Sequence, residues 1–392
     1  MTVAASQIPT HRDYTVLKQS PLLVSNRLRH LSSLQFMRPA LLLFILFLVF
    51  STTSPCFAEE ITGTAEAEET AVTVLIYHRI GEDKYPTTNI AVERFREQLE
   101  YLKNNDYTVI SLQQLLQFLQ NGISLPERSV VITFDDGYRS VYENGWPVLR
   151  EYGFPFTVFL YVSATDNKHW NYMTWDQVME MKAAGVDFQN HGFAHDHMAF
   201  RPSGMDMDEY RAWIRTDLEV STRMLSEKLK ERPRFFAVPY GEYNMDLLEE
   251  IRSFGYEAIL LQDPGSVSSD TEPFAIPREP ILGNDWSTME HFQMVLQRVD
   301  LPITGKIPAA GQLSHAVPDR FGAQLLYPER YIPGTLGIYV SELGWHKASV
   351  QGDFASITNS SSLSRRINRV AISGREKDSG RTAIRYWMLV RE

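Results

Sequence analysis

Two adjacent aspartates, Asp135 and Asp136, follow directly on the apolar run 129–134. Adjacent carboxylates at the end of a strand point in different directions, so one can bind a metal ion while the other acts as a base toward an attacking water. Gly137 allows the chain to turn sharply at this point. A solvated turn that caps the next helix would use the same residue types, because aspartate is also a good helix cap. The pair by itself leaves both interpretations open.

Two histidines four residues apart, His191 and His195, supply the nitrogen ligands that zinc prefers. In a helical turn this spacing places both imidazoles on one face. His197 lies close by, and three of the chain's 10 histidines fall in the segment 191–197, which favours metal binding over incidental surface histidines. Together with one aspartate, the pair would make a three-ligand site with room for water and substrate.

Two further polar segments also follow apolar runs. His78 comes after Ile76 and Tyr77, and it is either a core or supporting histidine or a catalytic acid. Pro239 and Tyr240 form a rigid turn whose backbone N–H groups could face a developing oxyanion. A purely structural turn explains the second segment equally well.

The elements that must position these residues alternate between strand and helix from residue 72 to residue 299, which predicts an α/β fold with a parallel sheet or barrel. Strand-like runs are 72–77, 129–134, 156–161, 186–188, 235–238, 256–261 and 274–276. Helical spacing is found in 92–102, 112–119, 142–152, 174–184, 208–229, 245–253 and 287–299. In such folds the chemistry lies at the carboxyl ends of the strands, where all four polar segments are found.

The residue composition and the hydrophobic periodicity change after Leu301. Residues 302–392 contain glycine, serine, proline and short apolar runs without a long helical period, so we expect a small C-terminal β domain. Trp345, Tyr386 and Trp387 could stack on sugar rings there, although β cores use aromatic residues just as readily.

Composition excludes several kinds of site. The chain has 392 residues, 44% of them hydrophobic and 22% charged, an ordinary globular balance with enough length for two domains. Its formal net charge of -10 argues against nucleic acid as a partner. The single cysteine, Cys56, excludes both an internal disulfide framework and a thiolate zinc site.

The N-terminal part has the features of a secretory signal. Arg38 and Pro39 precede the eleven apolar residues 40–50, and small residues precede a predicted cleavage after Ala58. An uncleaved signal anchor is the alternative, and it would be the only contact with a membrane. Met37 could be the true start of the chain, since 36 residues before it are unusual for a signal. The predicted product is exported.

The motifs 133–137, His191-x3-His195 and 239–241, in that order, resemble those of the polysaccharide deacetylases of carbohydrate esterase family 4, the NodB-homology group. The segment 77–80, Tyr-His-Arg-Ile, resembles the branch that includes the poly-β-1,6-N-acetylglucosamine deacetylases. The resemblance covers residues 72–300. It implies a distorted (β/α) TIM-like barrel, and metal-dependent removal of N-acetyl groups from an N-acetylated polysaccharide.

The resemblance also implies a role for each matching residue. Asp135 would be the general base and His78 the general acid. The metal ligands would be Asp136, His191 and His195, and the backbone N–H of Tyr240, after Pro239, would help to hold the oxyanion. Zinc is the favoured metal for such nitrogen and oxygen ligands, although other divalent ions fit similar sites.

The sequence departs from the family pattern in two places. Gly192 replaces the usual serine or threonine after the first metal histidine, so the loop lacks a hydroxyl that commonly braces it. The family's arginine before the Pro-Tyr motif is also missing, and Ala237 and Val238 stand there instead. Arg278 is our candidate for the side chain that orients Asp135.

The predicted organisation is a signal region over 1–58, a linker over 59–71, a deacetylase barrel over 72–300 and a small β-rich accessory domain over 301–392. The aromatic residues closest to the site segments, which either stack on sugars or pack in the core, are Tyr138, Trp175, Tyr240 and Trp286. The leading function is an exported polysaccharide N-deacetylase. The alternatives are an amidase acting on another non-peptide C–N bond and an inactive carbohydrate-binding protein.

Overall fold

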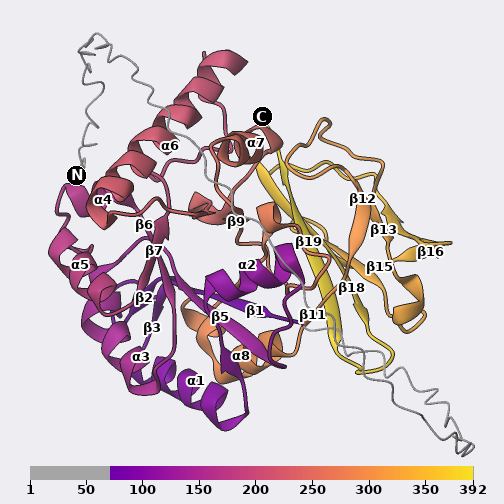
Figure 1. The fold of residues 1–392 in the computed structure, drawn as a ribbon. Coiled ribbons are helices and arrows are strands. Elements are labelled where there is room, and N and C mark those ends of the chain that lie inside the picture. Colours follow the sequence, from indigo (N-terminus) through magenta and orange to yellow (C-terminus); the bar gives the residue numbers. More distant parts are fainter. Residues whose placement is uncertain (1–70, 392) are drawn as a thin grey trace, which may run out of the picture. The chain divides into compact units, whose positions relative to one another are not determined.

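The computed structural model describes residues 71–391, which belong to one compact unit. Its larger part is a parallel sheet in the order β10-β1-β5-β6-β7-β8-β9, with β4 paired to β5, curled into a half-barrel (Figure 1). The strands are β1 (Thr73–Tyr77), β4 (Thr108–Val109), β5 (Ser129–Phe134), β6 (Thr157–Leu160), β7 (Asp187–Asn190), β8 (Phe235–Ala237), β9 (Ala258–Leu260) and β10 (Glu279–Pro280). The predicted distorted (β/α) barrel class is confirmed. The predicted signal region and the linker up to residue 70 lie outside the described residues.

The prediction of a strand over residues 274–276 is wrong in detail. Residues Pro273–Ala275 form a 3-10 turn, and the next strand is β10, which pairs with β1. Ile276 alone bridges to β9, where its N–H donates to Ile259 O and its carbonyl accepts from Leu261 N. Pro273 and Pro277 lack the N–H groups that a longer ladder would need. The segment 276–280 therefore joins β9 to β1 and closes the gap between the two ends of the sheet.

Helices surround the sheet, as Figure 1 shows. They are α1 (Val92–Asn104), α2 (Leu112–Asn121), α3 (Trp146–Tyr152), α4 (Val162–Asp166), α5 (Trp175–Ala183), α6 (Met207–Leu229), α7 (Met245–Ser253) and α8 (Met289–Leu296). The helix predicted over 142–152 begins instead as a π-helical turn, Val141–Gly145, that continues into α3. Two short strands, β2 (Arg79–Ile80) and β3 (Asn89–Ile90), follow β1 and pair with each other.

Alternate residues of each strand pack in different layers. In β5, Val130, Ile132 and Phe134 belong to the hydrophobic cluster between the sheet and helices such as α1 and α3. Val131 belongs to a separate hydrophobic cluster, which it shares with residues of β1, β6, β8 and β9 inside the barrel. Successive side chains of a strand point to opposite faces, so Thr133 and then Asp135 continue the inner series. This register explains why the first aspartate of the pair points into the barrel.

The C-terminal region consists of two sheets, in the orders β11-β19-β18-β14-β15 and β12-β13-β17-β16. The strands are β11 (Val299–Asp300), β12 (Ile303–Ile307), β13 (Arg320–Leu325), β14 (Gly337–Val340), β15 (Gly344–Lys347), β16 (Ser349–Gln351), β17 (Phe354–Thr358), β18 (Ile367–Arg375) and β19 (Thr382–Val390). Both sheets contribute to one hydrophobic core, to which β13 gives Phe321 and β14 gives Ile338. The strand-rich region predicted after Leu301 is present.

Trp387 belongs to this core and not to the surface. Its side chain is fully buried, and its Nε1 donates to Pro308 O at 3.1 Å. Of the two interpretations that the sequence left open for Trp387, core packing holds and glycan stacking does not, because this position of β19 faces the core.

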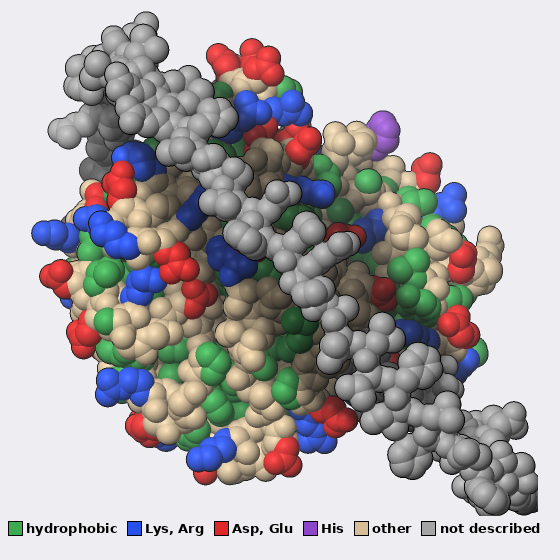
Figure 2. Space-filling model, in the orientation of Figure 1, with side chains coloured by type: hydrophobic (Ala, Val, Ile, Leu, Met, Phe, Trp, Pro, Cys, Tyr) green, Lys and Arg blue, Asp and Glu red, His purple; other side chains and the backbone are tan. Residues whose placement is uncertain are grey.

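One end of β19 packs against the barrel. Met388 and Val390 share a cluster with Tyr210 of α6, Leu247 of α7 and Phe236 of β8. None of the helices between residues 71 and 391 combines the length and the hydropathy that a membrane span requires. On the face seen in Figure 2, acidic, basic and hydrophobic side chains are interspersed over the described residues.

Replacing Trp387 by alanine should destabilise the C-terminal region strongly. A buried tryptophan truncated to alanine loses about 3–5 kcal/mol of unfolding free energy. Val350→Ala is the matched control, since Val350 is 44% exposed on the short strand β16 and should change stability by less than about 0.5 kcal/mol. Denaturant unfolding of both variants measures the difference, and equal stabilities would contradict this assignment of the core.

Candidate active site

The acid pair lies where β5 ends. Asp135 is fully buried, and its N–H donates to Tyr77 O at 2.9 Å, which continues the pairing with β1. Asp136 and Gly137 then both adopt left-handed backbone conformations, with φ of 70° and 74°. A Cβ at position 137 would lie 2.6 Å from Leu160 Cδ2, so a side chain there would have to displace Leu160 as well as adopt a left-handed backbone, which favours glycine. This turn sends the two carboxylates in different directions.

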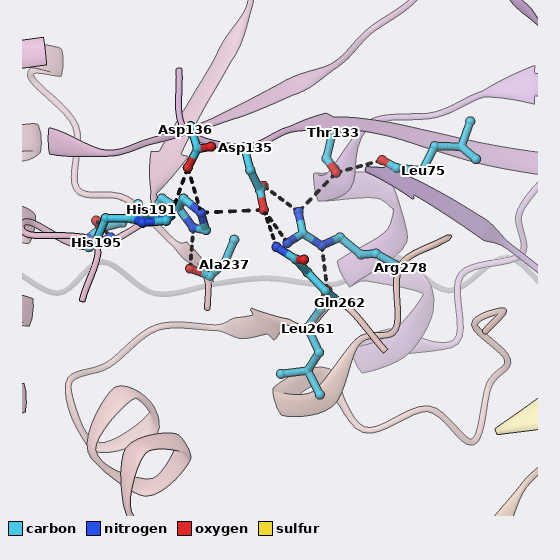
Figure 3. A network of polar contacts seen from close by, with 12 residues as sticks. Leu75, Thr133, Asp135, Asp136, His191, His195, Ala237, Leu261, Gln262 and Arg278 are labelled. Carbon is cyan, nitrogen blue, oxygen red and sulfur yellow. Dashed lines mark hydrogen bonds and ion pairs between the residues drawn. The ribbon is translucent and has the colours of Figure 1, made fainter. Parts of the chain in front are cut away.

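Arg278 holds Asp135 through a bidentate ion pair. Its Nη1 and Nη2 donate to Asp135 Oδ1 and Oδ2 at 2.7 and 2.8 Å, and both side chains are buried (Figure 3). The guanidinium is fixed in turn, because its Nε donates to Leu261 O at 2.7 Å. Burial raises the pKa of Asp135, but the charges of Arg278 and His191 outweigh this effect and lower it. Asp135 is therefore held ionised, beside the arginine that we selected as its partner.

Asp136, His191 and His195 bring three ligand atoms together. Asp136 Oδ1 lies 3.4 Å from His191 Nε2 and 3.0 Å from His195 Nε2, and the three atoms lie within 4.8 Å of one another (Figure 3). Ligands at about 2.1 Å from a tetrahedral zinc ion lie about 3.4 Å apart. Asp136 Oδ1 and His191 Nε2 are also buried without a hydrogen-bond partner among the described residues. The residues present therefore fit a divalent cation.

The protonation of His191 suits a ligand. Its Nδ1 lies 2.8 Å from Ala237 O, and because a carbonyl can only accept, Nδ1 carries a proton and Nε2 is the nitrogen that faces Asp136 and could bind a cation. Burial lowers the pKa of His191, but the charges of Asp135 and Asp136 outweigh it and raise the pKa above its ordinary value. The same concentration of negative charge favours a bound cation.

The two histidines do not lie in a helical turn, so that part of the prediction is wrong. Residues 191–197 form a loop after β7, in which Gly192 and His195 have φ of 82° and 54°. The loop folds back, and the two imidazole centroids lie 4.9 Å apart. A spacing of four residues serves a fold-back loop as well as a helix, which is why the ligands converge all the same.

Asp217 of α6 braces this loop, and the sequence analysis missed it. Its two carboxylate oxygens accept from Phe193 N and Ala194 N, each at 2.8 Å. A Cβ on Gly192 would lie 3.1 Å from Asp217 Oδ1, so the glycine allows this close approach. Burial raises the pKa of Asp217, while the two backbone N–H groups oppose the rise. The available signal was an acidic residue at helical spacing within the apolar face of α6, next to Leu218.

Asn190 gives the loop a second support. Its side-chain oxygen accepts from Gly192 N at 2.9 Å, and its amide nitrogen donates to Tyr256 Oη at 2.6 Å and to Ser221 Oγ at 2.9 Å. These contacts take the place of the hydroxyl that Gly192 lacks. The loop geometry is therefore set by the side chains of β7 and α6.

A cleft of about 1070 Å³ opens above the three ligand residues. His78, which follows β1, lines it with a mostly buried imidazole whose Nδ1 has no hydrogen-bond partner among the described residues. Burial lowers the pKa of His78, against the opposing charges of Asp136 and Asp135. Gln262, another residue that the sequence did not indicate, lines the cleft and donates to Asp135 Oδ2 at 3.4 Å.

The predicted aromatic residues divide into two groups. Tyr138, Tyr240 and Trp286 line the cleft, and Pro239 is buried beside Tyr240. The exposed Tyr240 ring stacks on His197 with the centroids 3.9 Å apart, and His197 also pairs with Glu242, outside the ligand triad.

Trp175 lies elsewhere. It packs against the helix-facing core, and its Nε1 donates to Asp166 Oδ1 at 3.1 Å, so it does not line the cleft. Helical spacing placed it correctly at the start of α5, but the indole faces the core and α4 instead of the site.

Known proteins with similar sequences are named as polysaccharide deacetylases. The family described as "Polysaccharide deacetylase" matches residues 122–259. A poly-beta-1,6-N-acetyl-D-glucosamine N-deacetylase of Staphylococcus epidermidis is 25% identical over 281 residues, covering 64% of this chain and 96% of that protein. The protein of the same name from Staphylococcus aureus strain MRSA252 is 27% identical over 216 residues, covering 54% of this chain and 72% of that protein.

Solved structures agree with the fold. IcaB from Ammonifex degensii has a TM-score of 0.50 and 26% identity, covering 58% of this chain and 96% of that chain. The deacetylase PplD of Streptococcus pyogenes, in complex with acetate, has a TM-score of 0.52 and 22% identity over 58% of this chain and 99% of that chain, which supports the fold alone. The chain therefore carries a polysaccharide deacetylase domain, the domain of hydrolases that act on carbon–nitrogen bonds.

Proposed function

We propose that this protein removes N-acetyl groups from N-acetylhexosamine units of a polysaccharide outside the cytoplasm, with a poly-β-1,6-N-acetylglucosamine-type polymer as substrate. The observation that carries the proposal is the pairing of two differently held carboxylates in one site. Asp135 is ion-paired to Arg278, and Asp136 faces two imidazoles at ligand distances. The names of the relatives supply the substrate class.

In this proposal the side chains divide the chemistry. A bound divalent cation would polarise the acetamide carbonyl and make the attacking water more acidic. Asp135 takes a proton from the water as the C–O bond forms, which needs the ionised carboxylate that Arg278 maintains. The protonated form of His78 would give a proton to the amine nitrogen as the C–N bond breaks, and acetate and a free amine result. The backbone N–H of Tyr240 would donate to the carbonyl oxygen and stabilise its developing charge.

Zinc is the proposed metal. Two imidazole nitrogens and one carboxylate oxygen make a common zinc ligand set that keeps a position open for substrate. Export is proposed from the apolar segment 40–50 and the predicted cleavage after Ala58, which lie outside the described residues.

The alternatives are less well supported. An inactive carbohydrate-binding protein would not need a buried ligand triad beside an ion-paired carboxylate. An amidase with another substrate is compatible with this barrel, but the relatives are named for N-acetylglucosamine polymers.

Acetate release from β-1,6-linked N-acetylglucosamine oligomers tests the proposal directly. We expect release by the zinc-loaded protein, loss after dialysis against a chelator, and recovery when zinc is restored. Oligomer binding without acetate release under any metal would favour the carbohydrate-binding protein instead.

Two substitutions separate the base from the ligands. Asp135→Asn should keep stoichiometric zinc but lower kcat by at least about 10²-fold, because the base is removed and the ligands remain. His191→Ala should lose both zinc and turnover. His197→Ala is the matched control and should retain zinc, since His197 lies outside the triad. Metal analysis and acetate assays measure these outcomes, and near-normal turnover by Asp135→Asn would show that another group is the base.

Asp217→Asn should weaken zinc binding by about 10–100-fold, because supporting residues of metal ligands typically have effects of this size. An amide can accept from only one of the two backbone N–H groups that the carboxylate now satisfies, so the histidine loop would loosen. Asp208→Asn, at an exposed position of the same helix, is the control. Zinc titration in competition with a chelating dye measures both affinities, and unchanged affinity in Asp217→Asn would rule out the bracing role.

A further inference from the structure

Three aromatic residues lie in one row across the C-terminal sheet. The strand register pairs Trp345 of β15 with Tyr339 of β14, Tyr339 with Ala371 of β18, and Ala371 with Tyr386 of β19. Directly paired residues share a face of the sheet, so the row runs without a break over four strands. The Tyr339 ring lies 5.3 Å from the Trp345 ring and 6.4 Å from the Tyr386 ring, between centroids. We call Tyr339, Trp345 and Tyr386 the aromatic row.

The aromatic row faces the catalytic cleft and is not part of the core. All three residues line the same cleft as His78, Asp136 and the two metal-site histidines. Trp345 is 52% exposed. The opposite face of the sheet supplies the buried core residues, such as Ile338. Packing therefore does not account for three neighbouring aromatic residues at these positions.

Polar contacts fix the row against the barrel. Arg369 of β18 lies on the same face of the sheet, and its Nε is 3.4 Å from Asp263 Oδ1. Tyr243 Oη donates to Asp263 Oδ2 at 2.8 Å and accepts from Met388 N at 3.1 Å. Asp263 and Tyr243 are both buried and belong to the barrel. The position of the row relative to the catalytic residues is thus set by the fold and not by a flexible linker.

The surroundings of the row match the chemistry of a sugar chain. Flat aromatic faces suit the apolar faces of pyranose rings, while Ser341 and Arg369, which line the same wall, can hydrogen-bond to hydroxyl groups. The cleft, at about 1070 Å³, slightly exceeds the range of about 300–1,000 Å³ that is typical of sites for small ligands. It therefore has room for more than the sugar that reacts.

We propose that the aromatic row binds the sugar units that neighbour the unit being deacetylated, so that the C-terminal sheet gives the enzyme its preference for polymer over short substrates. The proposal rests on the proposed function for the identity of the sugar. The predicted accessory domain is then part of the substrate site, and the ligand that binds to the aromatic row is a chain of pyranose units.

Steady-state kinetics on a hexamer and a dimer of β-1,6-linked N-acetylglucosamine test the row. Trp345→Ala and Tyr339→Leu should each lower the ratio of kcat/KM for hexamer to that for dimer by about tenfold, the effect of losing one ring contact together with its buried area. Trp170→Ala is the control, because Trp170 is 64% exposed and lies outside the cleft, so its ratio should not change. An unchanged ratio in both row variants, with the folded state verified by thermal denaturation, would overturn the proposal.

A binding experiment separates this proposal from the proposed function. Calorimetric titration of the full-length Asp135→Asn protein with the hexamer should show binding that Trp345→Ala weakens by about tenfold in the double variant. If the wild type releases no acetate but Trp345→Ala still weakens hexamer binding, the proposed deacetylation is wrong and sugar binding by the aromatic row is supported. If acetate is released and Trp345→Ala changes neither hexamer binding nor the kinetic ratio, sugar binding by the aromatic row is refuted and the proposed deacetylation is supported.

Discussion

The ion pair between Arg278 and Asp135 joins the chemistry of this protein to the closure of its barrel. A buried carboxylate is costly unless an opposite charge and hydrogen bonds compensate it, and the bidentate guanidinium supplies both. Arg278 lies in the segment 276–280, which joins β9 to β1. The same few residues therefore close the sheet and hold the carboxylate ionised. Loss of the arginine would leave a buried charge at the seam of the barrel.

This ion pair also determines what the neighbouring site can bind. Two buried aspartates and one buried arginine leave one uncompensated negative charge, which lies with Asp136 and the two imidazoles. His191 Nδ1 donates a hydrogen bond to Ala237 O, so Nε2 is the nitrogen that can act as a ligand. A divalent cation would more than offset this remaining charge, and it would lie where Asp136 Oδ1 and His191 Nε2, both without a hydrogen-bond partner among the described residues, converge. In the proposed mechanism, Arg278 thereby keeps Asp135 available for proton transfer, and Asp136 is left to bind the metal.

The sequence predicted the strand ends well because strand alternation and loop chemistry are local properties. The run 129–134 is β5 as expected, and the inner register of Val131 carries through to Asp135. The histidine loop could not be predicted, because its shape depends on Asp217, which lies on a helix after the loop. Burial of aromatic residues was equally ambiguous. Trp387 and Tyr386 are adjacent in one strand, yet one lies in the core and the other in the cleft.

The segment after β9 shows how the two parts of the molecule act on one site. Gln262 donates to Asp135, while its neighbour Asp263 contacts Arg369 and Tyr243. Gln262 and Asp263 therefore contact Asp135 and the C-terminal sheet, respectively. Because Arg278 also donates hydrogen bonds to this segment, at Leu261 O and Asp263 O, Asp135 and the aromatic row share one rigid support. A polymer lying on the row would then be held in a fixed position relative to Asp135, and fixed positions of this kind are what binding energy from distant sugar units requires to increase the rate of reaction.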